Sequence, residues 1–130
     1  MNKVAIVGYG YWGPNVVRNF VQHPDCDVKV ICDLNKDNLQ RAKELYPDLE
    51  VTQNFSEIIG DENINIVAVV TPVSTHFNLA LQVLKSKKHL FIEKPMVQSV
   101  NQGNKLIELA KKNDLIGAVD HTFLYTGAVK

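Results

Sequence analysis

A glycine-rich turn near the N-terminus is the first group of residues whose spacing suggests chemistry. Residues 8–13 read Gly-Tyr-Gly-Tyr-Trp-Gly, the G-x-G-x-x-G pattern, between a short apolar run and an amphipathic stretch. Gly8 allows a tight turn, Gly10 lets backbone N–H groups approach a pyrophosphate with no Cβ in the way, and Gly13 lets the next helix pack closely. The N-terminus of that helix adds a partial positive charge. The pattern therefore predicts a phosphate-binding loop, and a glycine-rich turn without a ligand is the alternative.

An acidic residue follows at the spacing that such a loop requires. Asp33 lies twenty residues beyond Gly13, at the end of the second apolar run. A carboxylate at that place accepts hydrogen bonds from the hydroxyl groups of an adenosine ribose, whereas a 2′-phosphate would be repelled by its charge. Leu34 and Asn35 come next and carry no positive charge, and Lys36 is the nearest cation. Asp33 and Leu34 therefore predict NAD rather than NADP as the cofactor.

Two aromatic side chains, Tyr11 and Trp12, lie on the glycine-rich loop and are also expected to contact the cofactor. We expect Trp12 to flank the nicotinamide or the entrance for the substrate. Packing beneath the loop, or against a further domain, is the alternative for Trp12.

A second loop follows the fourth apolar run and reads Thr71-Pro72-Val73-Ser74-Thr75-His76. Pro72 cannot donate a hydrogen bond to a strand ladder, so the strand is expected to end there. We expect Thr71 and Pro72 to line the cofactor groove and Ser74 to cap the next helix. His76 is placed among the cofactor-binding residues, and a partly solvated histidine without a catalytic role is the alternative.

A pair of opposite charges ends the fifth apolar run, where the sequence reads Glu93-Lys94-Pro95. Adjacent residues of a strand point to opposite faces, so Glu93 and Lys94 are expected to act separately. A surface salt bridge is the alternative.

Short β-branched runs alternate with amphipathic stretches along the whole chain, which indicates right-handed crossovers between parallel strands. The sequence predicts an α/β fold, a Rossmann-type doubly wound parallel sheet in three αβα layers, with ligands at the carboxyl ends of the strands. The expected strands are Lys3–Val7, Val28–Cys32, Glu50–Thr52, Ile64–Val70, His89–Ile92 and Leu115–Val119, and the expected helices are Pro14–Val21, Lys36–Tyr46, Phe55–Ile59, Thr75–Ser86 and Ser99–Lys112.

Length and composition indicate one soluble globular domain over residues 1–130. Hydrophobic residues make up 45% of the chain, and 14 Lys plus Arg balance 14 Asp plus Glu. This balance gives no electrostatic reason to expect nucleic acid or a membrane surface as a partner. The N-terminus lacks a signal-peptide pattern, and Cys26 and Cys32 match no metal-ligand spacing, so we expect a cytoplasmic protein without a metal site.

Taken together, GYGYWG, Asp33, TPVSTH and EKP resemble the glucose–fructose oxidoreductase/inositol dehydrogenase/rhizopine-catabolism (Gfo/Idh/MocA) family over essentially the whole chain. The resemblance implies that Lys94 lies near the nicotinamide and the reacting hydroxyl as a catalytic residue. It implies that Glu93 helps to hold the nicotinamide side of the cofactor. The other catalytic group of the family is typically a histidine in a C-terminal substrate domain, which we expect to follow Lys130 and to be absent from this chain. Asp120-His121 is not its equivalent by position.

The resulting hypothesis is the NAD-binding domain of an oxidoreductase that acts on a sugar or nucleotide sugar, inactive as a fragment and homo-oligomeric at full length. A stand-alone NAD-binding or sensing module without turnover is the alternative. A Rossmann domain for another adenosine ligand, such as S-adenosylmethionine, is a third possibility, against which the EKP motif argues.

Overall fold

The computed structural model describes residues 1–93, 97–119 and 122–123, and within them the strands form one sheet of order β3-β2-β1-β4-β5-β6-β7. Neighbouring strands from β3 to β6 pair in parallel, and β7 pairs antiparallel with β6. The strands are β1 (Asn2–Val7), β2 (Cys26–Cys32), β3 (Glu50–Thr52), β4 (Ile66–Val69), β5 (His89–Ile92), β6 (Gly117–Val119) and β7 (Thr122–Phe123). The sequence predicted the parallel strands, and β7 is an addition to that prediction.

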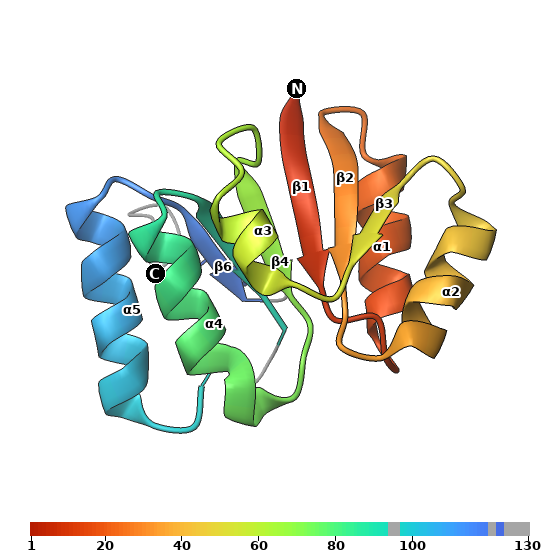
Figure 1. Cartoon of the computed structure of the whole chain (residues 1–130). Helices are drawn as coiled ribbons and strands as arrows, with labels where there is room; N and C mark the ends of the chain where they lie inside the picture. The colour runs from red at the N-terminus through yellow and green to blue at the C-terminus, as the bar shows by residue number, and fades with distance from the viewer. Residues whose placement is uncertain (94–96, 120–121, 124–130) are drawn as a thin grey trace.

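Among the described residues, five helices cover the two faces of this sheet (Figure 1). They are α1 (Gly13–Gln22), α2 (Lys36–Leu45), α3 (Phe55–Ile59), α4 (Val73–Lys85) and α5 (Val100–Lys112). Helices α1 and α2 lie on one face, and α3, α4 and α5 lie on the other. The predicted three-layer, doubly wound arrangement is therefore confirmed.

The central strand β1 contributes to both hydrophobic cores because its side chains alternate between the two faces of the sheet. Val4 and Ile6 pack with α1 and α2, whereas Ala5 and Val7 pack with the residues under α4 and α5. All four are fully or almost fully buried. A continuous apolar run is the pattern expected of a strand that is covered on both faces, and β1 lies inside the sheet, between β2 and β4.

Helix ends account for most differences from the predicted elements. Val21 and Leu45 continue the apolar patterns of α1 and α2, but both are exposed in the last turn of their helices. The predicted cap at Ser74 is wrong, since α4 begins at Val73 and places Ser74 inside the helix. No side chain caps α4, and the Oγ1 of Thr75 instead donates to the carbonyl of Pro72 at 2.7 Å.

No helix in the described part of the chain has both the length and the apolar character needed to cross a membrane.

Candidate functional site: a cavity at the carboxyl ends of the strands

A cavity of about 750 Å³ lies at the edge of the sheet where β1, β2, β4 and β5 end, the edge to which the arrows of β1 and β2 point in Figure 1. Its volume falls within the range of roughly 300–1,000 Å³ that is common for small-molecule sites. The lining residues are Val7, Gly8, Gly10, Tyr11, Trp12, Cys32, Asp33, Leu34, Asn38, Gln53, Phe55, Val70, Thr71, Pro72, Thr75, Leu79 and Glu93. The topology explains its place, because the connections from β1 and β4 leave in opposite directions here.

The glycine-rich loop forms one wall of this cavity, and its glycines are needed for different reasons. Gly8 has φ +107°, and a Cβ there would lie 2.7 Å from the carbonyl oxygen of Val70. A Cβ on Gly13 would lie 2.5 Å from the carbonyl oxygen of Gly8, so α1 packs directly against the turn. A Cβ on Gly10 would meet no atom within 4 Å. Gly10 therefore borders open space that a phosphate group can occupy, whereas Gly13 supports the loop from outside the cavity.

Asp33 lies beside this loop, directly after β2, and its carboxylate is held by three N–H donors. The backbone N–H of Tyr9 donates to Oδ2 at 2.7 Å, and the backbone N–H of Asn35 donates to Oδ1 at 2.8 Å. The side-chain amide of Asn38 donates to Oδ2 at 3.2 Å. Asp33 therefore has a fixed position relative to the glycine-rich loop, with acceptor capacity left on Oδ1.

The aromatic residues of the loop, Tyr11 and Trp12, both line the cavity, and their contact with a cofactor stays a prediction. Tyr11 is 96% exposed and Trp12 is 44% exposed, and their rings stack with centroids 6.4 Å apart. Trp12 also precedes the first residue of α1, and its carbonyl accepts a hydrogen bond from the N–H of Asn15 at 3.1 Å. The pair forms an aromatic surface at the mouth of the cavity.

The loop after β4 brings Thr71 and Pro72 to the cavity but buries His76 beneath it. The Oγ1 atoms of Thr71 and Thr75 share a hydrogen bond of 2.6 Å, which stabilises this turn. His76 is 1% exposed and does not line the cavity, and its Nε2 lies 2.7 Å from the carbonyl oxygen of Thr71. A carbonyl only accepts, so the ring donates there and supports the loop. The alternative of a partly solvated histidine is therefore wrong, and the structure places His76 behind the loop.

Glu93 lines the cavity at the end of β5, half-buried, and its backbone N–H donates to the carbonyl of Val69 at 3.0 Å. Lys94, the predicted catalytic residue, lies outside the described residues, as do Asp120 and His121. The described geometry therefore covers the glycine-rich loop, Asp33 and Glu93, and Lys94 stays a prediction.

Several lining residues were not predicted from the sequence, among them Asn38, Gln53 and Phe55. Gln53 follows β3 directly, and its Nε2 donates to the carbonyl of Leu34 at 2.8 Å. The rule that ligands bind at the carboxyl ends of strands would have identified Gln53 if it had been applied to the short strand β3 as well. Asn38 gave no such signal, because it lies within α2.

Cys32 contributes a thiol to the floor of the cavity. Burial, followed by the neighbouring charges of Asp33 and Glu57, raises the pKa of the Cys32 thiol to about 11. The group therefore stays protonated near neutral pH and serves as a small apolar wall rather than a nucleophile.

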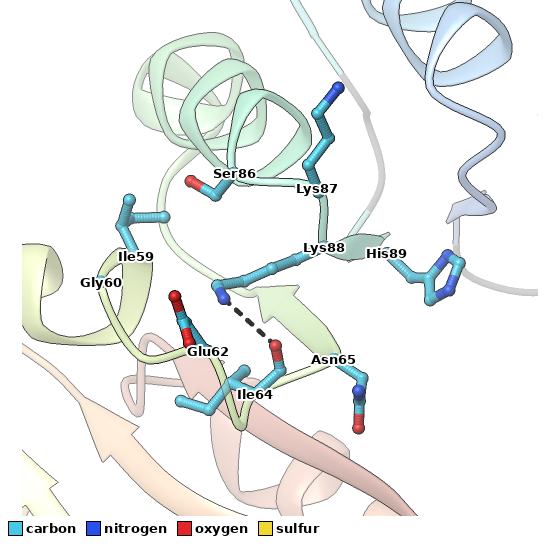
Figure 2. A pocket seen from close by; sticks show the side chains of 9 residues that line it. All are labelled: Ile59, Gly60, Glu62, Ile64, Asn65, Ser86, Lys87, Lys88 and His89. Carbon is cyan, nitrogen blue, oxygen red and sulfur yellow. Dashed lines mark hydrogen bonds between the residues drawn. The ribbon is translucent and has the colours of Figure 1, made fainter.

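A second cavity, of about 480 Å³, lies at the other edge of the sheet, where β5 begins (Figure 2). Lys88 extends beneath it, and its Nζ donates to the carbonyl oxygens of Asp61 at 2.7 Å and Ile64 at 3.1 Å. Burial lowers the pKa of Lys88, while the charges of Asp61 and Glu62 act in the opposite direction. These contacts join the loop before β4 to the loop before β5, so Lys88 has a structural role.

The sheet order, the glycine-rich turn at the end of β1 and the acidic residue at the end of β2 together define a dinucleotide-binding domain of the Rossmann type. The chain belongs to the Gfo/Idh/MocA oxidoreductases, since the model of that family, described as "Oxidoreductase family, NAD-binding Rossmann fold", matches residues 2–121. The predicted family membership is therefore confirmed, and NAD is the cofactor of the matching domain.

Two of the relatives are named as inositol dehydrogenases. The chain is 30% identical over 114 residues to myo-inositol 2-dehydrogenase of Thermotoga maritima, covering 88% of this chain and 34% of that protein. It is also 30% identical over 122 residues to the scyllo-inositol 2-dehydrogenase (NADP⁺) IolW of Bacillus subtilis, covering 92% of this chain and 33% of that protein. The chain thus spans about a third of the length of these relatives.

A solved structure with NAD bound has the same fold. The chain superposes on GenD2 from gentamicin A biosynthesis, in complex with NAD, with a TM-score of 0.88 and 25% sequence identity. The match covers 97% of this chain and 36% of GenD2.

Proposed function

We propose that this chain is the cofactor domain of an NAD-dependent oxidoreductase that transfers hydride between a hydroxyl of a sugar or nucleotide sugar and the nicotinamide. The observation that carries the proposal is one cavity with a glycine-rich loop and Asp33 on one side and Glu93 on the other. Relatives that oxidise a hydroxylated ring, as the inositol dehydrogenases are named to do, support the substrate class.

Each group of lining residues has a distinct part in this proposal. The backbone around Gly10 and the N-terminus of α1 bind the pyrophosphate, and Asp33 orients the adenosine ribose. Tyr11, Trp12 and Leu34 shield the dinucleotide from water, and Thr71 and Pro72 lie along its nicotinamide half. When bound, NAD supplies the hydride acceptor. Glu93 holds the nicotinamide side.

Lys94 would position the substrate hydroxyl and take part in moving its proton, as the family resemblance implies. The remaining catalytic group would come from a substrate domain that works together with this one. The balanced charge of the chain, 14 residues of each sign, supports a cytoplasmic enzyme with a small-molecule substrate rather than a nucleic-acid or membrane partner. We expect the full-length protein to form homo-oligomers.

This 130-residue chain is expected to bind NAD but to show no turnover by itself, because the residues proposed to contact the phosphates and the ribose lie within it, whereas it spans only about a third of the length of its relatives. Calorimetric titration with NAD, and an absorbance assay with sugars and nucleotide sugars, measure the two properties separately. Sustained NADH production by this chain alone would contradict the need for a substrate domain. Binding without turnover in the full-length protein as well would favour the stand-alone sensing module.

The unmodified domain is expected to prefer NAD over NADP by at least about tenfold, roughly 1.4 kcal/mol, because a 2′-phosphate would lie beside the Asp33 carboxylate. Asp33→Ser removes that charge and should narrow or invert the preference. Calorimetric titration of the unmodified domain and of the Asp33→Ser variant with NAD and with NADP gives the ratio of the two affinities for each protein. Asp37→Ser, an exposed acid one turn further along the chain, is the matched control and should leave the preference unchanged. Tighter binding of NADP than NAD by the unmodified domain would refute the proposed role of Asp33.

A further inference from the structure

Helix α2 brings a polar side chain, Asn38, into contact with Asp33 and a cation, Arg41, into contact with Asn38. A carboxylate has about four acceptor positions. Three of those on Asp33 are used by the N–H groups of Tyr9, Asn35 and Asn38 at 2.7–3.2 Å. Asn38 is the only side chain among these donors, and it lines the cavity together with Asp33. The orientation of the carboxylate toward the cavity therefore depends in part on the Asn38 amide.

The same amide joins Asp33 to a guanidinium group. Arg41, one turn further along α2, donates from its guanidinium to the Oδ1 of Asn38. Asn38 thus lies between an anion and a cation, with its Nδ2 on Asp33 and its Oδ1 on Arg41. Arg41 also acts on the side chain of Tyr9. The pKa of Tyr9 is raised overall, by burial and then by the charge of Tyr46, while the charge of Arg41 acts in the opposite direction.

We propose that Asn38 and Arg41 set the dinucleotide preference together with Asp33. Asn38 is a positioning residue that holds the carboxylate and anchors the guanidinium beside it. Arg41 is the cation that a 2′-phosphate meets on entering the ribose site, so the chain keeps a measurable affinity for NADP in spite of Asp33. The inference rests on the proposed use of this cavity for a dinucleotide.

The geometry favours Arg41 over Lys36, the cation that is nearest to Asp33 in sequence. Lys36 is the first residue of α2 and is exposed, whereas Arg41 is linked to the ribose site through Asn38. A guanidinium also presents several N–H groups in a planar fork that matches phosphate oxygens, which an ammonium group does not. Arg41 therefore has both the location and the hydrogen-bonding geometry to bind a 2′-phosphate.

The test is calorimetric titration of this chain and its variants with NAD and NADP. Arg41→Met is expected to weaken NADP binding about fivefold, as for an exposed charge-assisted contact, and to change NAD binding less than about twofold. Arg41→Lys should restore part of the NADP affinity. Lys36→Met is the matched control, a cation of the same helix, and should change neither affinity. The effect of Arg41→Met should shrink between about 0.05 M and 0.5 M salt, because screening weakens exposed charges.

A double-mutant cycle tests the part assigned to Asn38. Asn38→Ala should weaken NADP binding about as much as Arg41→Met does. The double variant should bind NADP only slightly more weakly than either single variant, because both substitutions break the same chain of contacts. The proposal would be overturned if Arg41→Met lowered the affinities for NAD and NADP equally or lowered neither. It would also be overturned if Lys36→Met, rather than Arg41→Met, lowered the affinity for NADP. An unmodified chain that binds neither dinucleotide would refute the cofactor site itself, which is a separate and recognisable failure.

Discussion

Replacing Lys94 with alanine is expected to lower kcat by roughly 10²–10⁴-fold when this domain works with its substrate domain, since that is the usual contribution of a general acid–base group. The affinity for NAD should change less than about twofold. The reason is that the proposed phosphate and ribose contacts come from the glycine-rich loop and Asp33, which follow other strands of the sheet. Steady-state kinetics and fluorescence titration of NAD separate the two effects.

Lys105 offers a matched control for this experiment, because it is an exposed lysine in the middle of α5. Lys105→Ala should leave both kcat and NAD affinity unchanged. A Lys94→Ala enzyme with normal kcat would remove the catalytic role that the family resemblance implies, while the cofactor site would stand.

The second large effect is expected at Gly8, where alanine should destabilise the fold by about 2–6 kcal/mol. The residue has φ +107°, a conformation that costs a non-glycine residue about 1–3 kcal/mol. Its new Cβ would also lie 2.7 Å from the backbone oxygen of Val70, and overpacking of this kind costs about 1–3 kcal/mol more. Urea denaturation measures the free energy of unfolding directly.

Gly10→Ala is the matched control for Gly8→Ala, because a Cβ at Gly10 meets no atom within 4 Å. Gly10→Ala should keep the unfolding free energy within about 1 kcal/mol, the cost or gain typical of a glycine-to-alanine change. It should nevertheless weaken NAD binding, since the methyl group enters the space proposed for the phosphates. Equal destabilisation by both substitutions would contradict the distinct roles assigned to the two glycines.

The sequence was sufficient to predict the order of strands and helices along the chain, because strands such as β1, β4 and β5 contain short apolar runs and the crossover helices are amphipathic. The run Val4–Val7 of β1 is buried, as its apolar sequence indicated, and β1 lies beside β4, the middle strand of the sheet. The sequence was not sufficient to place the helix ends. Val21 and Leu45 continue the apolar pattern there, but both side chains are exposed.

The site residues that follow strands could be predicted from the sequence, whereas those that lie on helices could not. Asp33 and Glu93 follow a strand directly and Thr71 lies two residues beyond β4, so the carboxyl-edge rule placed them at the cavity. His76 belongs to α4, and only the phase of that helix decides that its ring is buried behind the loop. Arg41 is missed for a similar reason, because its link to Asp33 runs through Asn38 across a helical turn.

The close approach of Gly8, Gly13 and Val70 has a consequence for the entropy of ligand binding. A Cβ at either glycine would strike the backbone of a neighbouring segment, so the end of β1, the start of α1 and the end of β4 hold one another in place. The backbone of the loop therefore has little conformational freedom left to lose when phosphates bind, and such preorganisation increases affinity. The ordering cost falls instead on side chains at the rim, above all Tyr11, which is 96% exposed.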